Sequence, residues 1–109
     1  MEYFGETKKL TKILNDPKLI QKYYGKDRAR RIIQRLDEFS AAVTLMDIPS
    51  DPPPRCHRLK GDLDKLFAVD VSGNYRMIFE AYDVNDQQTV DKAKAVTVQI
   101  VAIDDYHGK

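Results

Sequence analysis

Residues 66–82 contain the pattern that most restricts the fold, because two apolar segments flank a short glycine turn. Both segments are rich in Val, Ile, Phe and Tyr, and the turn between them is Ser72-Gly73-Asn74. This composition predicts a β-hairpin. Apolar side chains alternate with polar or small ones along the segments, so each strand is expected to have one apolar face.

The register of this hairpin follows from placing both apolar faces on the same side of the sheet. The apolar positions are odd-numbered on both strands: Phe67, Val69, Val71, Tyr75, Met77 and Phe79. Two odd-numbered residues can pair only across a loop with an odd number of residues. We therefore expect Val71 to pair with Tyr75 across a three-residue turn. Asp70 would then lie opposite Arg76 on the other face.

Arg76 has two possible roles on that polar face. Its planar guanidinium could bind a phosphate through two parallel hydrogen bonds. It could instead form a cross-strand ion pair with Asp70 or Glu80, and the pattern alone favours the ion pair.

The first half of the chain predicts helices. Thr7 is suited to cap a helix over residues 8–15, and Asp16-Pro17 opens a second helix that ends near Gly25. Residues 27–43 carry the strongest helical signal, with apolar residues at spacings of three and four: Ala29, Ile32, Ile33, Leu36, Phe39 and Val43. The charged residues of this helix, including Arg28, Arg31 and Arg35, are expected on its solvated face.

The remaining segments complete a sheet. Tyr3-Phe4 is either an edge strand or a packed terminus, and the proline-rich residues 47–54 form a loop that leads to a short strand in 55–60. Residues 83–94 are polar and predict a long, mobile connection, and residues 95–103 form a well-covered strand. The order predicts an α+β fold with N-terminal helices packed on one face of a small, mainly antiparallel sheet.

Composition limits the function classes. The 109 residues predict one domain, residues 1–109, with a net charge of +1 that divides into +3 for residues 1–50 and −2 for residues 51–109. Neither net charge is the strong positive excess that is typical of nucleic-acid-binding proteins. No run of about 18 apolar residues and no apolar leader is present, so we expect a cytoplasmic protein without membrane contact. The single cysteine, Cys56, excludes an internal disulfide and is expected to be a small buried thiol.

Few side chains are able to act on a phosphodiester. They are His57, Lys60, Arg76, Asp105, Tyr106 and His107. Cleavage of RNA without a metal needs a base for the 2′-hydroxyl, positive charge on the phosphate and an acid for the 5′-oxygen. Two histidines with a lysine and an arginine meet this need, since histidine titrates near neutral pH. A metal site at Cys56, His57, Asp105 and His107 is disfavoured because no ligand pair has zinc-site spacing.

Three segments together carry a resemblance to a known family. They are the H-R-L-K-G-D segment at 57–62, the V-S-G-N-Y-R hairpin at 71–76 and the D-Y-H segment at 105–107. In this order they resemble the HigB branch of the RelE/ParE toxin superfamily, over about residues 8–107. The resemblance implies helices on a curved antiparallel sheet whose open face holds the active site. It also implies a toxin that cleaves mRNA on the ribosome, without a cofactor, and a HigA-like helix-turn-helix antitoxin as partner.

The resemblance also implies roles for individual residues. His57, Asp105, Tyr106 and His107 would be catalytic, one histidine accepting the 2′-hydroxyl proton and the other returning a proton. Lys60, Arg76 and Arg58 would bind the RNA phosphates. Asp70 and Glu80 place negative charge near Arg76, and Ser72 stands where some relatives have a basic residue. Two alternatives therefore stay open: a ParE-like gyrase inhibitor without catalysis, and a catalytically weak module that binds the antitoxin.

Overall fold

The hairpin predicted from the sequence is present. The computed structural model describes residues 1–105, and it forms β3 (Phe67–Ser72) and β4 (Tyr75–Tyr82) with Asp70 opposite Arg76, as expected. The expected pairing of Val71 with Tyr75 is wrong, because the register shifts between Asp70 and Ser72 and sets Ser72 opposite Tyr75. The bulge absorbs one residue and leaves the two-residue loop of Gly73 and Asn74. Gly73 has a φ of +53°, which suits glycine in such a turn.

Within residues 1–105, five strands form one mixed sheet in the order β1-β5-β4-β3-β2. The edge strands are β1 (Glu2–Gly5) and β2 (His57–Arg58), and β5 (Thr97–Asp105) lies between β1 and β4. Strand β1 runs parallel to β5, and all other neighbours are antiparallel. Of the two possibilities for Tyr3-Phe4, the edge strand is therefore present. The last strand lies two residues further along the chain than predicted.

Three α-helices precede the main part of the sheet: α1 (Lys8–Leu14), α2 (Pro17–Tyr24) and α3 (Lys26–Ala41). The predicted caps are confirmed, since Thr7 Oγ1 accepts from the Leu10 N–H at 3.1 Å and Asp16 Oδ1 accepts from the Lys18 N–H at 3.0 Å. Short 3₁₀ helices follow at η1 (Leu45–Asp47) and η2 (Gly61–Leu63). None of the helices within residues 1–105 is both long and apolar enough to cross a membrane.

Helix α3 ends earlier than its apolar spacing predicted. Ala42 has an extended backbone, and its N–H bonds to the carbonyls of Glu38 and Phe39 to close the last turn. Val43 therefore leaves the helix and is 76% exposed, so its expected place in the core is wrong. The end of a helix depends on how the chain leaves it, which a periodic pattern does not specify.

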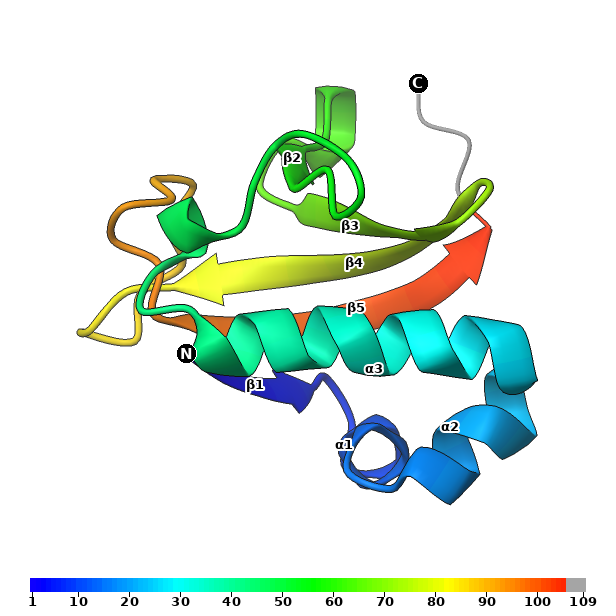
Figure 1. The fold of residues 1–109 in the computed structure, drawn as a ribbon. Coiled ribbons are helices and arrows are strands. Elements are labelled where there is room, and N and C mark those ends of the chain that lie inside the picture. Colours follow the sequence, from blue (N-terminus) through cyan, green and yellow to red (C-terminus); the bar gives the residue numbers. More distant parts are fainter. Residues whose placement is uncertain (106–109) are drawn as a thin grey trace.

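The main core lies between α3 and the sheet. Helix α3 runs along the sheet in Figure 1, and its Ile32, Leu36 and Phe39 belong to the same buried cluster as Phe67 and Phe79 of the hairpin. The ring of Phe39 meets Phe79 edge-on at 5.2 Å, and Phe79 stacks on Phe67 at 5.7 Å. The opposite face of the hairpin has a smaller apolar cluster, formed by Leu59, Ala68 and Ile78.

Arg35 is buried, which corrects its expected place on the solvated face. Its side chain is 2% exposed. Its Nε–H donates to the Asp70 carbonyl at 2.7 Å, and its Nη1 donates to both carboxylate oxygens of Glu38 at 2.9 and 2.8 Å. Arg35 lies three residues after Ile32 and four before Phe39, so it belongs to the apolar stripe. Helix α3 is thus joined to the main chain of β3 by a charged side chain.

We expect Arg35→Met to lower the free energy of unfolding by about 2 kcal/mol, since it removes charged hydrogen bonds while keeping much of the buried volume. Urea denaturation followed by circular dichroism measures this change. Arg31→Met, on an exposed position of the same helix, is the matched control and should change the value by less than about 0.5 kcal/mol. Equal effects of the two substitutions would show that burial of Arg35 does not matter.

Candidate functional site

The candidate site lies on the sheet face opposite the main core. Residues paired across antiparallel strands point to the same side of a sheet. One cross-strand row contains His57, Ala68, Ile78 and Ala102, and the next row contains Asp70, Arg76 and Asp104. From ordinary strand spacings, the Cα atoms of His57 and Arg76 are about 12 Å apart. Their side chains can therefore contact the same short stretch of a bound chain.

Asp70 binds two arginine side chains on this face. Its Oδ1 accepts from Arg76 Nε at 2.9 Å, and its two oxygens accept from Arg55 Nη2 and Nε at 3.0 and 2.9 Å. Arg76 also donates from Nη1 to the Gly73 carbonyl at 2.6 Å, and its side chain is only 12% exposed. The ion-pair interpretation of Arg76 is thus confirmed. Two guanidinium groups share one carboxylate, so the group of three keeps a net positive charge.

Arg55 was not predicted as a site residue. It has a φ of +46°, in the left-handed region that side chains rarely adopt. Its N–H bonds to the Asp51 carbonyl at 3.1 Å, and the next residue, Cys56, bonds to the Pro49 carbonyl at 2.9 Å. The proline loop is thereby folded so that Arg55 reaches Asp70. Neither periodicity nor spacing signals this contact, because it depends on the loop conformation.

His57 is held in one orientation on β2. Its Nδ1 lies 2.7 Å from the Arg55 carbonyl oxygen. A carbonyl can only accept, so the proton must be on Nδ1. In the neutral ring, Nε2 then carries the lone pair, and within residues 1–105 it has no hydrogen-bond partner. His57 is half-buried and can act as a proton acceptor through Nε2.

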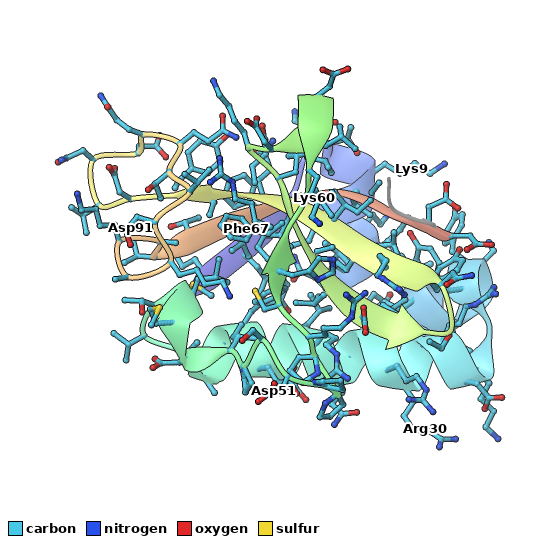
Figure 2. The ribbon with its side chains drawn as sticks, turned by 90° about the horizontal axis from the view of Figure 1, so that it is seen from above. Lys9, Arg30, Asp51, Lys60, Phe67 and Asp91 are labelled. Carbon is cyan, nitrogen blue, oxygen red and sulfur yellow. The ribbon has the colours of Figure 1, made fainter. Side chains whose placement is uncertain are left out.

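Arg58 and Lys60 follow His57 closely in the chain and are exposed, but Arg58 pairs with Phe67 of the main core, so the register places it on the face of β2 opposite His57. Arg58 donates from Nε to the Asp64 carbonyl, and its Nη2 lies 4.0 Å from the Asp64 carboxylate. Lys60 is the residue before the first residue of η2, and its side chain forms no capping hydrogen bond to that helix. Figure 2 shows Lys60 on the same side of α3 as Lys9, away from Arg30. Of the three predicted RNA-binding residues, Arg58 and Lys60 are exposed and Arg76 is half-buried.

The predicted C-terminal residues are only partly described. Asp105 is the last residue of β5 and pairs with Tyr75, and the Asp105 N–H donates to Asp104 Oδ1 at 2.7 Å. The register puts Asp104, not Asp105, in the row of Arg76. Tyr106 and His107 lie outside the described residues. The catalytic roles of Asp105, Tyr106 and His107 therefore stay predictions.

Cys56 is a buried thiol, as expected. Burial raises its pKa to about 11, although Lys92 lowers it in part. Lys92 belongs to the connection between β4 and β5, and its Nζ donates to the Cys56 carbonyl at 2.9 Å. A thiol with this pKa is protonated at neutral pH and is a poor nucleophile or metal ligand. Residues 1–105 contain no group of three or more His, Cys, Asp or Glu that could hold a metal ion.

The comparison with protein families assigns most of this chain. Residues 6–93 match the family described as the RelE-like toxin of type II toxin–antitoxin system HigB. The match includes His57, Arg58, Lys60 and Arg76 but ends before Asp105. No curated protein matches the chain. A type II toxin has an antitoxin as partner, and RelE-like toxins are generally endoribonucleases. Because the match covers well over half of the sequence, the chain belongs to the HigB-like family of RelE-like toxins.

Proposed function

We propose that this protein is a ribosome-dependent mRNA endonuclease that inhibits translation. The observation that carries the proposal is the imidazole of His57, whose Nδ1 is fixed by the Arg55 carbonyl. Its Nε2 is thereby directed away from that bond, on a sheet face that also holds Arg55 and Arg76. A fixed base beside positive charge is what cleavage of a phosphodiester requires. The family to which the chain belongs supports the same activity.

In the proposed reaction His57 acts as the base and no metal ion or cofactor takes part. Nε2 takes the proton of the 2′-hydroxyl, and the 2′-oxygen then forms a bond to phosphorus. The bond between phosphorus and the 5′-oxygen breaks, and His107 gives a proton to the leaving oxygen. The products are a 2′,3′-cyclic phosphate and a 5′-hydroxyl end. Asp105 would orient its neighbours, and Tyr106 would stack on a base.

The positive groups stabilise the additional negative charge of the phosphorane. Lys60 is exposed and would contact the phosphates directly, and Arg58, on the other face of the edge strand β2, would reach them around that edge. Arg76 is held by Asp70, so it would act mainly through its field unless the RNA displaces the carboxylate. We also propose that all helices lie on one face of the sheet, as the family predicts, and leave the other face open to mRNA on the ribosome.

A second candidate function is a catalytically weak module that binds its antitoxin. It is favoured by the ion pair of Arg76 with Asp70, which reduces the positive charge available to RNA. Under both functions the partner is a HigA-like helix-turn-helix antitoxin in the cytoplasm. A ParE-like gyrase inhibitor has no need for the fixed His57 ring.

The test is in vitro translation of a defined mRNA with purified protein, with 5′ ends mapped by primer extension. We expect cuts that depend on ribosomes and leave 5′-hydroxyl ends, which polynucleotide kinase can label directly. A His57→Ala, His107→Ala double variant, purified in the same way, should give none. Absence of cuts by the wild-type protein, with the antitoxin still bound, would favour the second function.

A further inference from the structure

Positive charge is concentrated in one segment of the chain. Residues 8–31 contain nine Lys and Arg residues but two Asp residues, a net charge of +7, while the rest of the chain has a net charge of −6. This segment forms α1, α2 and the start of α3, and all nine basic side chains are exposed. Averages over the two halves of the sequence hide this separation. The helical end of the molecule is therefore strongly basic.

Little of this charge is neutralised locally. Within residues 1–105, Arg30 is the one member of the set that pairs with a carboxylate, that of Asp27 at 3.7 Å. Both side chains of this pair are highly exposed, so the pair is weak. The other acid, Asp16, accepts the capping hydrogen bond of α2. A surface with this excess attracts polyanions.

An aromatic ring lies within the basic segment. Tyr23 is 48% exposed on α2, and the ammonium groups of Lys9 and Lys22 lie 5.5 and 5.9 Å from its ring centroid. We name these three residues the Tyr23 cluster. Nucleic-acid surfaces combine a flat ring, on which a base stacks, with cations that contact the adjacent phosphates. The Tyr23 cluster has both components, and the two ammonium groups that lie over the ring would move to the phosphates when a base stacks there.

The Tyr23 cluster is separate from the candidate site. In Figure 1, α1 and α2 lie beside the β1 edge of the sheet, and β2 with His57 forms the opposite edge. Tyr75 lies between the two regions, since it precedes Arg76 on β4 and its ring packs against the helical end, with centroid distances of 6.5 Å to Tyr24 and 4.0 Å to the Arg28 guanidinium. Figure 2 shows Lys9 and Arg30 on opposite sides of this end of the molecule. Positive charge thus surrounds the helical end.

We infer that the Tyr23 cluster and the surrounding basic segment bind the backbone of an RNA segment outside the reaction site. Tyr23 stacks on one base, and Lys9 and Lys22 contact the neighbouring phosphates. An acidic peptide would use the same lysines but would gain little from the exposed ring. The inference rests on the proposed function, because it assigns a second contact to the same RNA-cleaving protein.

The test is a binding titration that requires no cleavage. The full chain is titrated against a fluorescein-labelled RNA of about 20 nucleotides, with anisotropy read at several salt concentrations. Lys9→Gln with Lys22→Gln should weaken binding and lower the slope of log Kd against log salt by about 2. Tyr23→Leu should raise Kd about tenfold and leave the slope unchanged. Lys65→Gln with Lys94→Gln is the control, since it removes the same charge from exposed positions elsewhere.

Each outcome decides the inference. If the test pair and the control pair of lysine substitutions weaken binding equally, binding depends only on net charge and the inference is overturned. Unchanged RNA binding by the Tyr23→Leu variant would also overturn the inference. Competition by poly-glutamate at equal charge concentration would assign the surface to an acidic protein instead. Failure of the proposed function is distinct, because a protein that does not cut mRNA can still give the predicted binding pattern. Cuts by the wild type with no effect of the Tyr23 cluster on binding would overturn this inference alone.

Discussion

Phe39→Ala is expected to lower the free energy of unfolding by about 4 kcal/mol, the typical cost of removing a buried aromatic side chain. Phe39 is fully buried in α3 and packs edge-on against Phe79, which stacks on Phe67. The substitution therefore leaves a cavity where the helix meets the hairpin. A domain of this size has a total stability of roughly 5–15 kcal/mol. The variant should thus melt roughly 20 °C below the wild type.

The measurement is thermal and urea denaturation followed by circular dichroism. Phe39→Leu keeps part of the volume and should cost about 1 kcal/mol, so it stays measurable if the alanine variant fails to fold. Val43→Ala is the exposed control near the end of the same helix, and it should change stability by less than about 0.5 kcal/mol. A loss below about 1 kcal/mol for Phe39→Ala would mean that this contact does not hold the two layers together.

Local rules were sufficient for much of the fold. Thr7 and Asp16-Pro17 predict helix starts because capping depends on a few adjacent residues, and both caps are present. Ser72-Gly73-Asn74 predicts a turn for the same reason, although Ser72 pairs with Tyr75 and the loop has two residues instead of three. Arg35 was missed although its spacing places it between Ile32 and Phe39. The charge of an arginine predicts exposure, but its position along the helix determines whether the side chain faces the core.

The site was less predictable because it depends on contacts between distant segments. The pairing of Asp70 with Arg76 follows from strand register, but the contact of Arg55 with Asp70 depends on the loop before β2. The register of β5 shifts at its pairing with Ile78 and Phe79, so sequence could not tell which of Asp104 and Asp105 shares the row of Arg76. A single bulge reverses the side of the sheet to which the following residues point.

His57→Asn is expected to reduce ribosome-dependent cleavage by about 100-fold to 10,000-fold, the usual contribution of a positioned acid or base. The amide nitrogen of asparagine takes the place of Nδ1, so it can still donate to the Arg55 carbonyl, which now bonds to Nδ1 at 2.7 Å. It cannot accept and release a proton at neutral pH. The substitution therefore separates the chemistry of the ring from its structural bond. Single-turnover cleavage of mRNA on purified ribosomes measures the change.

The controls decide what a loss would mean. The His57→Asn protein should unfold at the same urea concentration as the wild type and bind its antitoxin equally well, since the side chain keeps its bond to the Arg55 carbonyl. Lys65→Gln, at an exposed position after η2, should leave the cleavage rate unchanged. If His57→Asn cleaves at the wild-type rate, the base is another group and the fixed ring is structural. If it loses cleavage but retains antitoxin binding, the imidazole supplies the proton transfer that the fixed tautomer makes possible.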